Sequence, residues 1–132
     1  TSDLVSAFEK TRKIQLSIMD IFGSEISNYG VVQYNPINGK VEGLVEKPEE
    51  NLAPSNSASI GRYVLTAEIF DILENQTVGK GGEIQLADAI NILAKENKVE
   101  TVKLKGNRFD CGSVKGYLAG INFVANKLKI NN

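Results

Sequence analysis

The sequence predicts an α/β protein in which helices flank a mixed sheet, and three observations support this class. Strand-like runs alternate along the chain with runs that repeat apolar residues at helical spacing. A hairpin signal joins two of the strand-like runs and requires an antiparallel pair. The length of 132 residues suits one domain, so we expect residues 1–132 to form a single unit.

The first two elements are a helix and a strand. Leu4, Val5 and Phe8 recur at helical spacing, which predicts a helix over residues 3–12. Residues 14–19 then place an apolar residue at every second position. That period is typical of a strand that covers a core with one face.

The next elements form a hairpin followed by a loop. The β-prone runs 29–34 and 40–46 are separated by a segment ending in Asn38-Gly39, a pair that supplies the positive φ angles of a tight turn. Residues 47–59 carry two of the three prolines and show no periodicity. We therefore expect them to form a surface loop.

The middle of the chain predicts a strand that passes directly into a helix. Residues 60–65 are expected to form a buried strand. Thr66 can cap the following helix, in which Ile69, Phe70 and Leu73 form one apolar face.

Three further elements complete the pattern. Apolar spacing predicts a helix over about residues 83–95 and a last strand over residues 99–104, followed by a turn over residues 106–112. Ser113 is the expected cap of a final amphipathic helix. Its apolar face would contain Tyr117, Ile121, Val124 and Leu128.

Charge and composition exclude several classes of function. Fifteen Lys and Arg balance sixteen Asp and Glu, giving a formal net charge of −1, so the chain has no overall field that would recruit nucleic acid or an anionic membrane. Because the chain contains no His, imidazole bases, His zinc ligands and Ser-His-Asp relays are excluded within it.

The expected compartment is the cytoplasm. Cys111 is the single cysteine and cannot form an internal disulfide, which fits a reducing environment. No apolar run approaches the length of a membrane span, and no secretory signal opens the chain, which begins at Thr1 without an initiator Met.

The sequence lacks the usual glycine-rich phosphate-binding motifs. Neither G-x-x-x-x-G-K-[ST] nor G-x-G-x-x-G occurs, and residues 79–82 (Gly-Lys-Gly-Gly) are the one candidate. They lie between two helical patterns and not after a strand, which disfavours phosphate binding there.

Two segments around the predicted hairpin could bind a polar ligand. At Glu46-Lys47-Pro48, on adjacent pleats of a strand end, the carboxylate could accept hydroxyl hydrogen bonds and the ammonium could offset a phosphate. A solvated strand end explains the same residues. Tyr29-Gly30 could offer a ring, a hydroxyl and close backbone approach, although Gly30 can equally mark a strand entrance.

Asp110 is the candidate metal ligand. It follows a predicted strand and precedes a helix, where one carboxylate oxygen can hold a hard cation such as Mg²⁺. Asp is also a common turn residue. Four basic residues are scattered over strand edges and are interpreted as solvated charge, not as a nucleic-acid-binding stripe: Lys13, Lys103, Lys105 and Arg108.

Six blocks, taken in order, resemble the C-terminal part of the bacterial UTP–glucose-1-phosphate uridylyltransferase family. The resemblance covers about residues 3–128, and the order of the blocks makes it more specific than any one of them. The blocks are 27–32 (SNYGVV), 44–48 (LVEKP), 53–56 (APSN), 60–66 (IGRYVLT), 82–86 (GEIQL) and 109–112 (FDCG). Ala87 departs from the family, which usually has Thr at that position.

The resemblance implies a sugar nucleotidyltransferase (Rossmann-like) fold that makes UDP-glucose and pyrophosphate from UTP and glucose 1-phosphate with Mg²⁺. It implies that Tyr29, Gly30 and Glu46 belong to the sugar-binding segments. It further implies that Lys47 contacts the sugar phosphate as the catalytic residue and that Asp110 lies by the metal.

One large departure limits these expectations. The family's nucleotide-binding loop and first metal-binding aspartate belong to an N-terminal half that this sequence does not contain, so we expect the 132 residues alone to be inactive. The alternatives are another sugar-1-phosphate nucleotidylyltransferase of the dTDP- or ADP-glucose type, a non-catalytic sugar-phosphate-binding module, or an oligomerisation piece. The family resemblance also implies a homo-oligomer.

Overall fold

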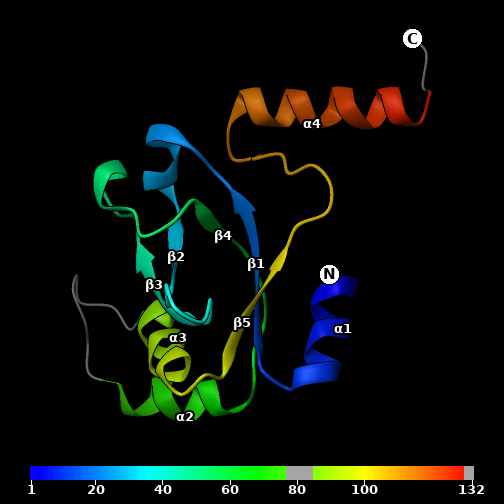
Figure 1. Ribbon diagram of the computed structural model, residues 1–132. Helices are drawn as coiled ribbons and strands as arrows, with labels where there is room; N and C mark the ends of the chain where they lie inside the picture. The colour runs from blue at the N-terminus through cyan, green and yellow to red at the C-terminus, as the bar shows by residue number, and fades with distance from the viewer. Residues whose placement is uncertain (77–84, 130–132) are drawn as a thin grey trace.

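A computed structural model describes residues 1–76 and 85–129 and contains a five-stranded mixed sheet (Figure 1). The strand order is β3-β2-β4-β1-β5. β1 and β5 are parallel, whereas the pairs β1–β4, β2–β3 and β2–β4 are antiparallel. This confirms the predicted class. The strands are β1 (Ile14–Asp20), β2 (Gly30–Tyr34), β3 (Val41–Glu46), β4 (Ser57–Val64) and β5 (Val99–Lys103).

The described residues form four α-helices and two short 3-10 helices. The predicted helices are confirmed with small shifts at their ends, while the 3-10 helices were not predicted. Residues 79–82 and the expected start of the third helix, residues 83–84, lie outside the described residues. The helices are α1 (Ser2–Thr11), η1 (Gly23–Asn28), η2 (Glu50–Leu52), α2 (Glu68–Asn75), α3 (Leu86–Lys95) and α4 (Val114–Lys127).

Two apolar clusters form the core on opposite faces of the sheet. The larger cluster joins β1, β2 and β3 to α2 and α3 and includes Leu16, Val32 and Leu93. The smaller cluster contains Ile21, Ile26, Val31 and Ala58. Because neighbouring residues of a strand point to opposite faces, Val31 and Val32 belong to different clusters.

β1 differs from its prediction because it is buried on both faces. The alternating apolar residues do pack in the larger cluster, but the polar residue Gln15 is only 1% exposed. Its amide donates hydrogen bonds to Thr11 Oγ1 at 3.0 Å and to Glu100 Oε2 at 3.1 Å. The buried Gln15 side chain therefore has hydrogen-bond partners on both α1 and β5.

The prediction for β4 is partly wrong. The strand begins at Ser57, inside the expected loop, and its most buried residues are Ala58 and Ser59. Its later residues bulge away from β1, since Tyr63 pairs with Leu16 and Ser59 with Ile18. Gly61 lies in this bulge with a φ of 76°, a conformation that glycine adopts without strain.

The hairpin is confirmed, but its turn is longer than the Asn-Gly pair suggested. Asn35 Oδ1 accepts hydrogen bonds from the amides of Ile37 and Asn38, and the Asn35 amide donates to Lys40 O at 2.8 Å. Gly39 has a positive φ of 70°. The Asn35 side chain therefore organises the turn together with Asn38, whose Oδ1 accepts a hydrogen bond from the Lys40 amide at 3.0 Å.

α2 differs from the prediction at its cap and on its apolar face. Its N-cap is Ala67, which makes no side-chain capping bond. Thr66 contributes through its backbone, because its carbonyl accepts a hydrogen bond from the Ile69 amide at 3.1 Å. Ile69 is buried, but Phe70 is 65% exposed. Leu73 does pack against the core, as expected.

α4 begins as predicted and lies apart from the rest of the molecule (Figure 1). Ser113 Oγ accepts a hydrogen bond from the Gly116 amide at 3.1 Å, which confirms the cap. None of the helix residues is buried. Within the described residues, no helix has the length and apolarity needed to cross a membrane.

Candidate functional site

The site expected from the sequence is built where β2 begins and β3 ends. Gly30 and Glu46 are register partners in these antiparallel strands. A Cβ placed on Gly30 would lie 3.0 Å from Glu46 Oε2 and 3.2 Å from Leu44 Cδ2. The missing side chain of Gly30 therefore leaves the space that the exposed Glu46 carboxylate occupies.

Lys47 leaves the sheet in a left-handed conformation. Its φ is 44°, which costs a residue with a side chain about 1 to 2 kcal/mol. The Lys47 amide donates to Tyr29 O at 3.0 Å, and this bond holds the turn after β3 against the start of β2. The sequence predicted that Glu46 and Lys47 would lie on adjacent pleats of one strand. β3 instead ends at Glu46, so the direction of Lys47 is set by its own backbone conformation and not by the alternation of a strand.

Tyr29 joins this strand end to a distant part of the chain. Its hydroxyl accepts a hydrogen bond from Arg108 Nη1 at 3.0 Å and donates one to Glu25 Oε1 at 3.3 Å. The Arg108 guanidinium carbon lies 5.3 Å from the centre of the tyrosine ring, a cation–π distance. Tyr29 thus contacts Lys47 through its backbone and Arg108 through its side chain.

Asp110 lies two residues after Arg108, in the exposed turn that leads into α4. Its Oδ1 accepts a hydrogen bond from the Gly112 amide at 3.1 Å. Its carbonyl accepts from the Ser113 hydroxyl at 3.2 Å. One carboxylate oxygen is therefore engaged in the turn, and the acidic group faces solvent.

The structure brings together Tyr29, Gly30, Glu46 and Lys47 directly, and it connects the Asp110 segment to them through Arg108. Their charged groups are exposed, which suits the binding of a charged polar ligand from solvent. In the described part of the chain, no group of three or more Asp, Glu, Cys or His side chains is arranged to hold a metal ion.

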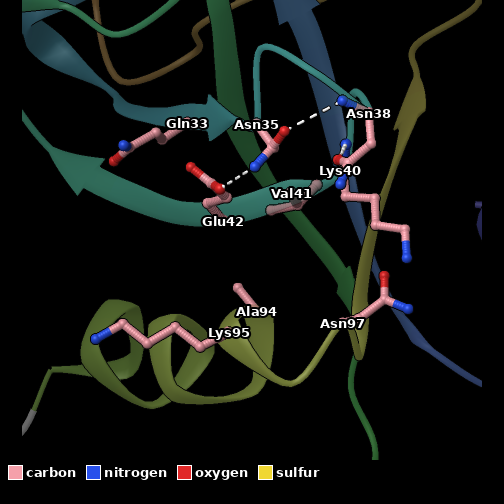
Figure 2. Close-up of a pocket in the computed structure, with 9 residues that line it drawn as sticks. All are labelled: Gln33, Asn35, Asn38, Lys40, Val41, Glu42, Ala94, Lys95 and Asn97. Carbon is pink, nitrogen blue, oxygen red and sulfur yellow. Dashed lines mark hydrogen bonds between the residues drawn. The ribbon is translucent and has the colours of Figure 1, made fainter.

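A pocket lies elsewhere, between the hairpin turn and the end of α3 (Figure 2). It has a volume of about 450 Å³ and a mostly polar lining that includes Asn35, Glu42 and Lys95. On the hairpin side of the pocket, Asn35 donates to Glu42 at 2.6 Å (Figure 2). Since Tyr34 and Val41 are register partners next to this turn, the pocket is at the opposite end of the hairpin from Gly30 and Glu46.

Sequence reasoning missed Arg108. Of the four residues interpreted as solvated charge, Arg108 contacts Tyr29. The three lysines form ion pairs: Lys13 with Glu100, Lys103 with Asp20 and Lys105 with Asp3. The available signal was the position of Arg108 two residues before Asp110. Its partner lies 79 residues away in the chain, so no local pattern could identify the contact.

With this fold and strand-end site, the chain belongs to the nucleotidyl transferase family, whose model matches residues 2–127. Among its relatives, it is similar to the UTP–glucose-1-phosphate uridylyltransferase of Pseudomonas aeruginosa, with 42% identity over 125 residues. That match covers 92% of this chain and 45% of the relative. The resemblance expected from the six sequence blocks is thereby confirmed.

Solved structures give the same result. A UDP-glucose pyrophosphorylase complexed with UDP-glucose matches with a TM-score of 0.83 and 38% identity over 95% of this chain and 49% of that one. A UTP-bound UGPase from Acinetobacter baumannii matches with a TM-score of 0.81 and 34% identity, over 96% and 44% of the two chains. The chain therefore spans about half the length of the relatives it matches.

Proposed function

We propose that residues 1–132 are the sugar-phosphate-binding, C-terminal part of a UTP–glucose-1-phosphate uridylyltransferase. The observation that carries the proposal is the pairing of Gly30 with Glu46, beside Lys47 held by Tyr29. A carboxylate and an ammonium at one strand end match the hydroxyls and the phosphate of a sugar phosphate. The similarity to pyrophosphorylases solved with UDP-glucose and with UTP supports the same ligands.

In the proposed reaction, a phosphate oxygen of glucose 1-phosphate attacks the α-phosphorus of UTP. The new P–O bond forms UDP-glucose, and the bond from the α-phosphorus to the bridging oxygen breaks, so that pyrophosphate leaves. Both reactants are anions, so positioning and charge compensation must supply most of the catalysis. Glu46 would orient the sugar, and Lys47 would compensate the charge of its phosphate.

Asp110 fits the role of one ligand to Mg²⁺. Its Oδ1 accepts a hydrogen bond from the Gly112 amide, and the residue as a whole is exposed. Mg²⁺ commonly binds one or two protein carboxylates together with substrate phosphates and water. When bound, the ion would compensate phosphate charge, and the Asp110 carboxylate would hold it near the start of α4.

Calorimetric titration of the 132-residue chain tests the proposal. We expect UDP-glucose and glucose 1-phosphate to bind and UTP alone not to bind measurably, with no UDP-glucose formed by the chain alone. Glu46→Gln should weaken UDP-glucose binding about tenfold, because a charged hydrogen-bond acceptor is lost. Glu49→Gln, an exposed carboxylate in the loop that follows β3, is the control. Tight UTP binding that does not depend on Glu46 would contradict the proposal.

The proposal also includes the cytoplasm as compartment and self-association as a homo-oligomer. The exposed free thiol of Cys111 is consistent with a reducing compartment. Exposed apolar residues of α4, such as Val114, Tyr117 and Leu118, are surface that an additional polypeptide could cover. Multi-angle light scattering tests self-association, and a monomer at high micromolar concentration would contradict it.

A further inference from the structure

The segment between β5 and α4 carries Asp110 from the sheet to the separate helix. It is fixed to the sheet at its beginning, where the Leu104 amide donates to Ile18 O at 2.8 Å. From residue 105 to residue 108 every residue is exposed and none lies in a helix or strand. The backbone by itself therefore gives little reason for the segment to keep one path.

The far end of the segment is packed onto α4. The rings of Phe109 and Phe123 lie 5.2 Å apart, and a Cβ on Gly120 would be 3.3 Å from Phe109 Cβ. A Cβ on Gly116 would be only 2.0 Å from Asp110 O, so this close approach requires glycine. Residues 109–110 and α4 consequently form one packed unit.

Arg108 connects this packed unit to the hairpin. Its guanidinium donates to the Tyr29 hydroxyl at 3.0 Å and lies over the tyrosine ring. The Tyr29 carbonyl in turn accepts the Lys47 amide, and the next residue, Gly30, pairs with Glu46. A continuous series of contacts thus runs from the segment that carries Asp110 to the strand end that carries Glu46 and Lys47.

We propose that Arg108 is a positioning residue that holds the Asp110 segment at a fixed place relative to the Glu46–Lys47 strand end. The inference rests on the proposed function, in which these two groups serve the metal and the sugar phosphate of one ligand. Without the Arg108–Tyr29 contact, each group keeps its own surroundings, but their separation is no longer set. An indirect role fits the contacts of the Arg108 guanidinium, which lie on the hydroxyl and the ring of Tyr29.

A double-mutant cycle with Arg108→Gln, Tyr29→Phe and the combined variant tests this assignment. UDP-glucose binding is measured by calorimetry with and without Mg²⁺. Arg108→Gln should weaken binding about tenfold with Mg²⁺ and less than twofold without it. The distance between Asp110 and the Glu46–Lys47 strand end matters only when the ligand binds to both, and Asp110 takes part only through the metal ion. Adding Tyr29→Phe to Arg108→Gln should have little further effect.

Arg108→Lys should restore part of the loss, since an ammonium keeps the cation–π contact but not the planar guanidinium.

Arg12→Gln is a matched control, because the Arg12 guanidinium carbon also lies over a ring, 5.6 Å from the centre of Phe8, and Arg12 directly follows α1, away from the site. It should leave binding unchanged. Equal losses for Arg108→Gln with and without Mg²⁺, or no loss, would overturn the assignment.

Amide relaxation by NMR separates failure of the inference from failure of the proposed function. Arg108→Gln should lower the heteronuclear NOE of residues 105–108 and shift the amide signals of Tyr29 and Lys47, whether or not any ligand binds. If the parent chain fails to bind UDP-glucose, the proposed function fails, and these signals alone decide whether Arg108 positions the segment. Unchanged NOE values and unchanged amide signals would overturn the positioning role.

Discussion

At the scale of single residues, two backbone features shape the candidate site. Gly30 is needed for space, since its φ is ordinary and the Glu46 carboxylate occupies the position next to its Cα. Lys47 is the opposite case, because a bulky residue adopts a φ of 44° that glycine would adopt more easily.

Gly30→Ala should displace the Glu46 carboxylate. The added methyl group would lie 3.0 Å from Glu46 Oε2 and 3.2 Å from Leu44 Cδ2. We expect UDP-glucose affinity to fall about tenfold and the free energy of unfolding to fall by about 1 kcal/mol, as for other overpacked sites. Calorimetry and urea unfolding measure the two effects. Unchanged affinity would show that the carboxylate position does not matter for binding.

Lys47→Ala and Lys47→Gly should separate the ammonium from the backbone conformation. In an enzyme that joins this chain to a nucleotide-binding half, Lys47→Ala should lower turnover by about 10² to 10³, the usual effect of losing one preorganised electrostatic donor. Lys47→Gly should lower turnover similarly but raise the free energy of unfolding by about 1 kcal/mol, since the strain at φ is relieved. Lys40→Ala, at the other end of the hairpin, is the control. Turnover retained in both Lys47 variants would exclude the proposed role.

At the scale of elements, a side chain of α3 forms hydrogen bonds with backbone groups at the outer edge of the hairpin and so holds the hairpin in place. β3 is an edge strand, so some of its backbone groups lack a strand partner. Asn91 of α3 donates to Leu44 O at 3.1 Å and accepts from the Leu44 amide at 2.5 Å. One side chain thus replaces a missing strand at Leu44 and fixes the hairpin on α3.

Asn91→Ala should therefore destabilise the protein by about 2 kcal/mol, because two partly buried backbone groups lose their partner. Urea unfolding followed by circular dichroism measures the change. Asn75→Ala on α2 removes an exposed side-chain bond to Asp71 O and should cost less than about 0.5 kcal/mol. Equal effects of the two substitutions would contradict the role given to Asn91.

At the scale of the whole molecule, a polar network joins α1, β1 and β5. Burial raises the pKa of Glu100, but hydrogen bonds from Gln15, Thr11 and Lys13 lower it by more, so the net pKa lies below its ordinary value. A carboxyl group with a lowered native pKa contributes stability above its unfolded pKa of about 4.3, and the contribution is lost as the pH falls through the native pKa.

Glu100→Gln should therefore reduce the acid sensitivity of the protein. Between pH 6 and pH 3, the free energy of unfolding of the parent chain should fall more steeply than that of Glu100→Gln, as measured by urea unfolding at each pH. Glu9→Gln, an exposed substitution on α1, should retain the parent slope. A parent slope retained by Glu100→Gln would exclude this network as a source of acid sensitivity.

The sequence by itself determined the order of helices and strands, the hairpin and the Ser113 cap, because side-chain periodicity and turn chemistry act over a few residues. It also identified the segments of the candidate site through motif blocks, and the family comparison confirmed the resemblance. Local signals were weaker where burial decided the outcome, as at Gln15, whose amide has partners on both α1 and β5.

Only the tertiary structure decided which distant residues meet. The path after β5 brings Arg108 to Tyr29, 79 residues earlier in the chain. Contacts of this kind depend on how the whole chain packs, so no short pattern in the sequence encodes them.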